Sequence, residues 1–294
     1  MSECAERAAP LLRVVAGALV DDRGRVLITE RPAGKAFAGR WEFPGGKLAS
    51  GETPRAALGR ELAEELGIEV GRAEPLLAVT HRYPAAAVAV QIDCWRVDSW
   101  RGEPAALDSQ RLRWCTREEL AAADILEADR PIVTALLLPR VFVHLEASEP
   151  LLEQAATVPA GRERTAWLVH VLPADSGVTR RLAERGDQVF LIDPHAPPAG
   201  GAGCLYTTAH HFAPAPSRQA PAGRVVHGAS EARAAQAAGA DFLVVPDGHL
   251  PRAELRGIAA AGLPWYLEAA SPADEAEPAP TGRLQWRAAA GARL

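Results

Sequence analysis

The sequence predicts two domains: an α+β sandwich with a mixed sheet between helices over residues 1–138, and a small α/β barrel over residues 139–294. A chain of 294 residues exceeds the usual size of one domain and fits two. In the first part, strand patterns surround two helical patterns, which favours a sandwich. After Pro139 the composition shifts towards Ala, Pro, Gly and Arg, and short apolar strands alternate with Ala-rich helical stretches. That alternation is typical of βαβ units and a parallel sheet.

In the first domain, residues 12–30 are predicted to form a β-hairpin, because two apolar strand patterns flank a cluster of turn residues. A stretch punctuated by glycine and proline then runs as far as Thr53. The clearest helix is Pro54–Leu66, since Thr53 suits the N-cap, Pro54 the first helical position and Gly67 the C-terminal stop. Further strands are predicted at 75–81, 87–97 and 111–115, followed by a short helix from Thr116 and a helix ending near residue 138.

Eight short apolar stretches mark the strands of the second domain. Eight strands of this kind favour a closed (β/α)₈ barrel, but the domain is shorter than the roughly 200 residues that such barrels usually need. A small, eroded, TIM-barrel-like domain is therefore predicted. The stretches begin at residues 141, 166, 188, 203, 224, 241, 264 and 283.

Charge and cysteine usage restrict the cellular setting. The net charge of −5 argues against a general nucleic-acid-binding protein, but it allows a nucleotide enzyme whose metal ion supplies positive charge locally. The four cysteines are scattered without a CxxC pair, so neither a zinc site nor a disulfide framework is expected. The N-terminus is acidic where a signal peptide would be basic, and no apolar run approaches the roughly 20 residues of a membrane span. We therefore expect a cytoplasmic protein that binds neither nucleic acid polymers nor membranes.

Three glutamates of the predicted helix carry the strongest chemical signal. Glu61, Glu64 and Glu65 fall at positions i, i+3 and i+4, so their carboxylates share one face of the helix. Carboxylates this close repel one another unless a cation joins them, and hard oxygen ligands suit Mg²⁺ or Mn²⁺. A solvated acidic face is the plainer alternative, in which Arg60 bonds Glu64 across one turn or orients a carboxylate. The glycines before the helix and Glu52, all in register, favour the metal site.

The string from Gly46 to Ile68 resembles the Nudix box, GX₅EX₇REUXEEXGU with U a bulky apolar residue, at every specified position. Upstream, E-R-P at 30–32 and W-E-F-P-G-G-K at 41–47 resemble the MutT-type branch, the pyrophosphohydrolases that sanitise oxidised nucleotides. The resemblance covers residues 12 to about 138. It implies a Nudix sandwich that uses Mg²⁺, with Mn²⁺ possible, to cleave a nucleoside triphosphate to a monophosphate and pyrophosphate.

The resemblance also implies roles for individual residues. Water attacks the β-phosphorus and the nucleoside monophosphate leaves; Glu61 is the first candidate for the general base, although the residues leave this choice open. Glu52 is expected to support the loop and the helix rather than to bind metal. The expected catalytic residues are Glu61, Arg60 and Glu64, the expected metal ligands are Gly45, Glu61, Glu64, Glu65 and Asp108, and the expected substrate contacts are Arg31, Phe43, Lys47, Tyr83 and Asp129.

Three departures from the branch bear on the substrate. Asp108-Ser109-Gln110 stands where the branch has E-G-Q, so Asp108 either reaches the metal with a shorter arm or is a plain loop residue. After Tyr83, a basic residue of some relatives is missing. Asp129 replaces an asparagine that pairs with oxidised guanine, and an ionised aspartate cannot donate a hydrogen bond. We hypothesise a weakened preference for 8-oxo-dGTP and a shift towards bases such as oxidised adenine; the alternative is that Asp129 caps the following helix.

The second half resembles the TenI-like, thiamine-phosphate-synthase-like domains that are fused to MutT-type domains in bacteria. The resemblance rests on L-P at 138–139, A-H-H-F-A at 209–213 and V-H-G-A-S-E at 226–231. L-I-D-P at 191–194 and L-E-A-A at 267–270 replace the residues that hold pyrophosphate and magnesium in the synthases, so synthase activity is not expected. Two other functions stay open: hydrolysis of a thiamine-related pyrophosphate, and a barrel that acts as a non-catalytic ligand sensor regulating the hydrolase.

Several histidines of the second half fall at or just beyond predicted strand ends, where barrel sites form. A metal or ligand pocket is one interpretation, and ordinary hydrogen-bonded histidines are the favoured alternative. These residues are His195, His210, His211, His227 and His249.

Overall fold

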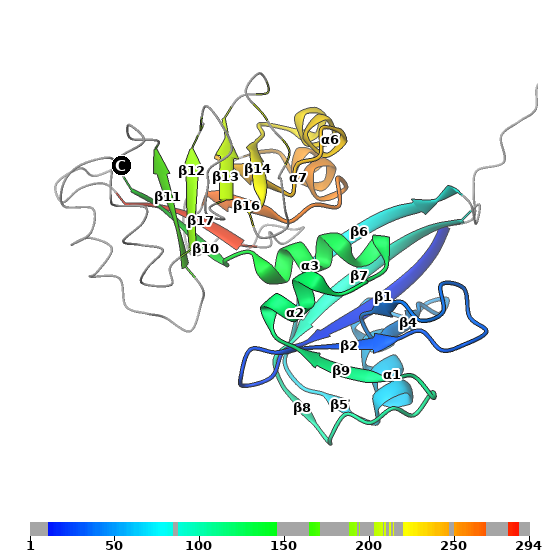
Figure 1. The fold of residues 1–294 in the computed structure, drawn as a ribbon. Helices are drawn as coiled ribbons and strands as arrows, with labels where there is room; N and C mark the ends of the chain where they lie inside the picture. The colour runs from blue at the N-terminus through cyan, green and yellow to red at the C-terminus, as the bar shows by residue number, and fades with distance from the viewer. Residues whose placement is uncertain are drawn as a thin grey trace, which may run out of the picture. The chain divides into compact units, whose positions relative to one another are not determined.

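The structure is a computed structural model that describes residues 11–84, 88–145, 165–170, 188–192, 194, 203–207, 209, 212, 214, 220–246, 250–268 and 282–287 (Figure 1). The chain divides into two compact units, Met1–Val133 and Thr134–Leu294. This division falls within a helix, and the predicted boundary after residue 138 stays a prediction. Within the described residues, no helix has both the length and the apolar character needed to cross a membrane.

The first unit contains a four-stranded mixed sheet in the order β4-β1-β7-β6. The strand β1 pairs antiparallel with β4 and parallel with β7, and β6 pairs antiparallel with β7. Residues 15–19 of β1 are buried on both faces, as befits a central strand. The strands are β1 (Leu11–Leu19), β4 (Gly45–Lys47), β6 (Ala73–Tyr83) and β7 (Val88–Val97).

The predicted hairpin over residues 12–30 is wrong beyond its turn. Asp21 accepts hydrogen bonds from the backbone N–H groups of Arg23 and Arg25, and an isolated bridge joins Val20 to Val26. The chain then enters a separate antiparallel sheet in the order β3-β2-β9. The reason is that β4 and β7 already occupy the two edges of β1, which leaves few backbone groups for a ladder with β2. These strands are β2 (Val26–Glu30), β3 (Trp41–Glu42) and β9 (Leu112–Cys115).

The helix α1 (Pro54–Leu66) confirms the predicted helix at both ends. The Thr53 side chain accepts a hydrogen bond from the Ala56 N–H at 3.3 Å, and Gly67 ends the helix with a left-handed φ of 69°. The apolar face packs against β1, where Gly17 leaves room for the Leu62 side chain. Burial of this face directs the acidic residues of α1 away from the core. The buried residues of α1 are Ala57, Leu58, Leu62 and Leu66.

The remaining elements of the first unit complete the sandwich. A short pair, β5 (Glu69–Val70) and β8 (Trp100–Arg101), lies beside α1 in Figure 1. The predicted helix after Thr116 is confirmed, because Thr116 and Glu119 form a reciprocal capping box. The last predicted helix is preceded by a 3₁₀ turn. These elements are α2 (Arg117–Ala122), η2 (Glu127–Asp129) and α3 (Arg130–Leu137).

The second unit is built on eight parallel strands paired in chain order, with β17 pairing back to β10 so that the sheet closes. Each of the eight predicted apolar stretches overlaps one of these strands, although β14 begins two residues before its predicted stretch. The helix α6 (Ala229–Ala237) follows β14, and α7 (Arg252–Ala259) follows β15. The strands are β10 (Val141–Leu145), β11 (Thr165–His170), β12 (Gln188–Ile192), β13 (Gly203–Tyr206), β14 (Ala222–Val225), β15 (Phe242–Val245), β16 (Trp265–Glu268) and β17 (Gly282–Arg287).

Aromatic rings fill the described part of the interior of this closed sheet. Phe242 contacts Phe190 and Tyr266 edge-to-face, with ring centroids 5.6 and 6.0 Å apart. Glycines make room for the rings: a Cβ atom on Gly203 would lie 2.2 Å from the Phe190 ring, and one on Gly223 would lie 2.3 Å from the Phe242 ring. In the part that the structure describes, side chains thus fill the interior of the sheet.

Candidate active site

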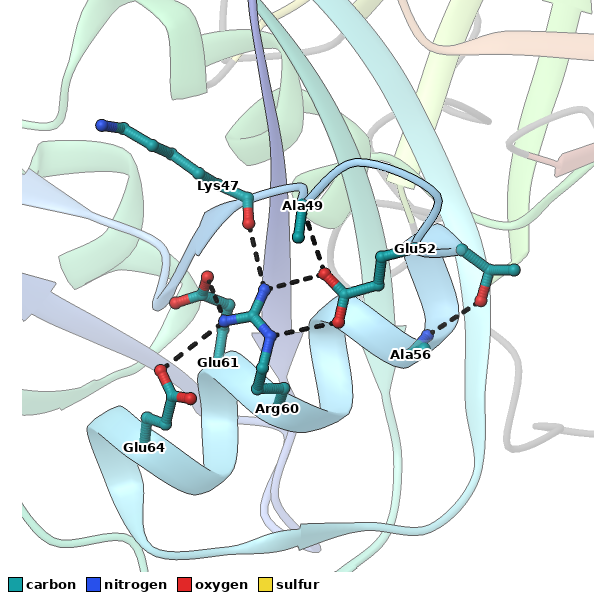
Figure 2. A network of polar contacts seen from close by, with 8 residues as sticks. Lys47, Ala49, Glu52, Ala56, Arg60, Glu61 and Glu64 are labelled. Atoms are coloured by element: carbon teal, nitrogen blue, oxygen red, sulfur yellow. Dashed lines mark hydrogen bonds and ion pairs between the residues drawn. The ribbon is translucent and has the colours of Figure 1, made fainter.

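Arg60 is the centre of a polar network that joins α1 to the loop before it (Figure 2). Its guanidinium donates to both carboxylate oxygens of Glu52, at 3.1 and 2.9 Å, and to the Lys47 carbonyl at 3.1 Å. It also donates to Glu61 at 2.8 Å and lies 3.6 Å from the Glu64 carboxylate. These hydrogen bonds, first of all those with Glu52, raise the pKa of Arg60. Arg60 therefore fixes the loop and two of the candidate carboxylates at once.

Glu52 lies on the loop side of this network. Besides Arg60, its carboxylate accepts a hydrogen bond from the Ala49 N–H at 3.2 Å. The hydrogen bonds from Arg60 hold the pKa of Glu52 below its usual value. The described contacts of Glu52 all lie within the loop and α1, as expected of a residue that supports the loop and the helix.

Two glycines let the loop backbone approach its neighbours closely. A Cβ atom on Gly46 would lie 2.2 Å from Oε2 of Glu61, so the Glu61 carboxylate occupies the space that a side chain would need. Gly45 has a φ of 148°, and a Cβ atom there would lie 2.2 Å from the Val15 carbonyl oxygen. Only glycine fits at Gly45, whereas a side chain at Gly46 would have to displace the Glu61 carboxylate.

Glu65 lies among other carboxylates. It accepts a hydrogen bond from the Gly45 N–H at 3.0 Å. Burial raises the pKa of Glu65 to about 7, and the nearby charges of Glu42, Glu61 and Asp108 act in the same direction. Negative charges this close together are stabilised when a cation joins them.

The donor set fits a hard divalent cation, although its members are spread. Within the described residues, no three His, Cys, Asp or Glu side chains are already grouped to hold a metal ion. Glu61 faces Arg60, the Glu64 side chain is 62% exposed, and Glu65 is hydrogen-bonded to Gly45. Oxygen donors around a backbone turn without side chains are nevertheless the chemistry that Mg²⁺ prefers. The structure thus places four of the five predicted ligands on one turn and one helix, and the fifth, Asp108, on the loop before β9.

At another part of the unit, Asp129 is 5% exposed, and its carboxylate accepts a hydrogen bond from the Phe43 N–H at 3.4 Å. Burial raises the pKa of Asp129 to about 8, and the charge of Glu42 adds to the effect. This shift favours the protonated form of Asp129 near neutral pH, in contrast to the ionised form assumed from the sequence. Its described hydrogen bond also differs from a helix cap. A protonated carboxyl both donates and accepts a hydrogen bond.

Arg31 and Tyr83 lie near Asp129. Arg31 forms an ion pair with Glu42 and donates to the Ala36 carbonyl at 2.7 Å. The Tyr83 hydroxyl accepts a hydrogen bond from the Ala128 N–H at 3.2 Å. Burial raises the pKa of Tyr83, and the charge of Asp129 contributes in the same direction. Four of the five predicted substrate contacts thus surround one region; these are Arg31, Phe43, Tyr83 and Asp129.

Lys47 differs from these four residues. Its backbone carbonyl belongs to the Arg60 network, while its side chain is exposed and extends away from that network in Figure 2. The carbonyl contact comes from the backbone, so the residue type at this position does not reveal it.

Sequence reasoning missed three residues of this region. Glu42 pairs with Arg31, and burial raises its pKa. Gln110 donates from its side chain to the Glu65 carbonyl at 3.1 Å. Phe37 contacts Tyr83 in a tilted arrangement with ring centroids 5.0 Å apart. Glu42 and Gln110 lay inside quoted motifs, but only long-range contacts reveal what they touch.

The described part of the second unit adds no metal site. Among the histidines singled out there, His227 is described, and its backbone N–H donates to Glu231 at 2.9 Å. The others, His195, His210, His211 and His249, lie outside the described residues.

Comparison with known proteins gives concordant results. A family model of the NUDIX domain matches residues 15–135. A Mycobacterium tuberculosis protein provisionally named 8-oxo-dGTP diphosphatase 2 is 49% identical over 121 residues, which are 40% of this chain and 82% of that protein. CTP pyrophosphohydrolase of Escherichia coli is 36% identical over 140 residues, 48% of this chain and 97% of that protein. 8-oxo-dGTP diphosphatase of Haemophilus influenzae is 35% identical over 127 residues, 43% of this chain and 92% of that protein.

Proposed function

The chain belongs to the NUDIX hydrolase family, and from this premise we propose that it is a Mg²⁺-dependent pyrophosphohydrolase of the MutT type. The proposed reaction cleaves a nucleoside triphosphate, oxidised or normal, to the monophosphate and pyrophosphate. Its proposed use is to remove oxidised nucleotides from the nucleotide pool. Mn²⁺ is a second candidate metal, and the names of the relatives support nucleotide substrates in general.

The observation that carries this proposal is the set of carboxylates around the Gly45-Gly46 turn. Glu61 and Glu65 contact or adjoin the two glycines, and Arg60 holds Glu61 and Glu64 on the same side of α1. The ligands proposed for the metal are the Gly45 carbonyl and the carboxylates of Glu61, Glu64, Glu65 and Asp108. When bound, the ion polarises the phosphoryl oxygens and lowers the pKa of the attacking water.

In the proposed reaction, a water oxygen forms a bond to the β-phosphorus, and the bond from that phosphorus to the α–β bridging oxygen breaks. The monophosphate leaves with the bridging oxygen, and the new oxygen stays in pyrophosphate. A carboxylate takes the proton of the water, and Glu61 is our candidate. Arg60 donates to its Oε1, so Oε2, the oxygen beside Gly46, is the proposed acceptor.

For the nucleobase, we propose that Asp129 acts in its protonated form near neutral pH. A neutral carboxyl offers one donor and one acceptor, as an asparagine amide does, and so suits oxidised guanine. Once ionised it accepts only, which suits oxidised adenine, a base that offers two N–H groups. The earlier hypothesis of a weakened preference for 8-oxo-dGTP then applies only above the pKa of about 8.

The test is hydrolysis of a substrate panel with Mg²⁺, measured as pyrophosphate from the triphosphates, phosphate from thiamine pyrophosphate and monophosphate from the nucleotide sugar. The panel holds 8-oxo-dGTP, 8-oxo-dATP, dGTP, CTP, thiamine pyrophosphate and a nucleotide sugar, with Glu64→Gln as the control. We expect release from a triphosphate that disappears in the control. Hydrolysis of thiamine pyrophosphate alone would instead support the thiamine-related alternative, and activity that persists in the control would overturn the proposed site.

The second unit is proposed to be related to TenI-like, thiamine-phosphate-synthase-like barrels. Its closed sheet of eight parallel strands supports this relationship. At the start of α6, the Glu254 carboxylate accepts a hydrogen bond from the Ala229 N–H at 2.7 Å. A helix N-terminus satisfied by a carboxylate of the chain offers less to a phosphate group, in line with a barrel that lacks synthase activity.

A further inference from the structure

The loop before β9 returns to the C-terminal end of α1 and is anchored there by three hydrogen bonds. The Ala105 N–H donates to the Leu66 carbonyl at 3.0 Å. The Leu107 N–H and the side-chain amide of Gln110 both donate to the Glu65 carbonyl, each at 3.1 Å. Two anchors on one carbonyl therefore flank the residues 108 and 109.

Asp108 lies between these two anchors. Its side chain is exposed, and no hydrogen bond to the carboxylate is recorded among the described residues. Both anchors reach the Glu65 carbonyl, so the backbone of Asp108 lies near Glu65, and the charge of Asp108 adds to the raised pKa of Glu65. Ser109 adopts a left-handed φ of 60°, which is unusual for a residue other than glycine and turns the chain back so that Gln110 reaches α1. The place of Asp108 is thus set by its neighbours.

Gln110 lowers folding stability in a way that a purely structural anchor would not require. It is 7% exposed, and its Oε1 atom is buried without a hydrogen-bond partner. A buried acceptor left unsatisfied lowers folding stability, and such groups in native proteins call for an explanation.

From these contacts we propose that Gln110 is a positioning residue for catalysis, which holds the Asp108 carboxylate beside Glu65 by clamping its loop to the end of α1. The proposal rests on the proposed function, because Asp108 and Glu65 are candidate metal ligands there. Gln110 itself touches neither the metal nor the substrate. A glutamine that only satisfied the helix end would affect stability but not the action of Asp108.

A double-mutant cycle on the full-length protein separates these two roles. Gln110→Ala is expected to lower kcat about tenfold with little change in KM, because small displacements of a catalytic group have large effects on rate. In the Asp108→Ala background, Gln110→Ala is expected to have no further effect on kcat. Multiplied losses in the double variant would overturn the proposal.

Mn²⁺ binding, followed by electron paramagnetic resonance without substrate, gives a readout that does not depend on hydrolysis. Gln110→Ala and Asp108→Ala are each expected to weaken Mn²⁺ binding several-fold, and the double variant no more than Asp108→Ala. Leu107→Ala, which keeps the backbone donor and removes only a 56% exposed side chain, is the matched control and is expected to bind like the wild type. Unchanged Mn²⁺ affinity in Gln110→Ala, with or without a fall in melting temperature, contradicts the proposal. If the wild type hydrolyses no triphosphate, the proposed function fails, and the Mn²⁺ titration still decides this inference.

Discussion

The Asp129 carboxyl accepts a hydrogen bond from the backbone N–H of Phe43 at 3.4 Å, across 86 residues of sequence. Phe43 stands two residues before Gly45, whose N–H donates to Glu65. The candidate base-recognition residue and the candidate metal ligands are therefore attached to one short segment, residues 42–46. Glu42 in the same segment contributes to the raised pKa of both Asp129 and Glu65.

Base selectivity is expected to depend on pH through Asp129. Below the pKa of about 8 the protonated carboxyl donates and accepts, and above it the carboxylate only accepts. The ratio of kcat/KM for 8-oxo-dGTP to that for 8-oxo-dATP should fall as the pH rises from 7 to 9. Asp129→Asn, which always offers a donor, should keep the ratio constant. Identical pH profiles for the two proteins would show that Asp129 does not select the base.

The free energy of unfolding is expected to fall as the pH rises, because of the same titration of Asp129. The folded-state pKa of Asp129, about 8, lies above its ordinary value of 3.8, so the folded protein binds more protons between these values. The contribution of Asp129 is complete below about pH 4 and is lost as the pH rises through 8, with a slope of up to about 1.4 kcal/mol per pH unit. Urea unfolding at several pH values should show this slope in the wild type relative to Asp129→Asn. Parallel curves for the two proteins would contradict the assignment.

Alanine at the two glycines of the turn should separate activity from folding. In Gly46→Ala the new Cβ meets the movable end of Glu61, so kcat/KM should fall about 100-fold while the melting temperature stays close to that of the wild type. In Gly45→Ala the Cβ meets the Val15 backbone at a positive φ, so stability should fall by about 1–3 kcal/mol. Gly59→Ala, whose Cβ would meet only the Arg55 guanidinium at 3.8 Å, should retain activity. Full activity in Gly46→Ala would argue against a part for Glu61.

Glu64→Gln should remove activity without affecting the fold. The Glu64 side chain is 62% exposed and takes no part in the core, so the melting temperature of the variant should match that of the wild type. Loss of a candidate metal ligand should lower kcat by at least about 100-fold. Glu69→Gln, with a side chain that is 71% exposed, is the matched control and should be fully active. Equal activity in both variants would exclude Glu64 from the site.

The stability of the second unit is expected to depend on the hydrogen bond of the Tyr266 hydroxyl. This buried group donates to the Pro139 carbonyl at 2.6 Å, and burial raises its pKa. Tyr266→Phe leaves that carbonyl without its donor and should destabilise the protein by about 1–3 kcal/mol. Urea unfolding measures the loss, and an unchanged midpoint would mean that the hydrogen bond contributes nothing to stability.

The sequence by itself determined the elements whose information is local. Thr53 and Gly67 fixed both ends of α1, because an N-cap side chain and a left-handed C-terminal residue act within one turn of the helix. The i, i+3, i+4 spacing placed Glu61, Glu64 and Glu65 on one face for the same reason. The eight apolar stretches located the strands of the second unit, since strand patterns also span few residues.

Only the tertiary structure decided features that depend on distant partners. The expected hairpin failed because β4 and β7, far apart in sequence, fill the edges of β1. The raised pKa of Asp129 could likewise not be predicted from the sequence, since a pKa follows from burial and neighbouring charges rather than from residue type. The contacts of Glu42 and Gln110 belong to this class too. Pairing edges, desolvation and long-range hydrogen bonds exist only once the chain has folded.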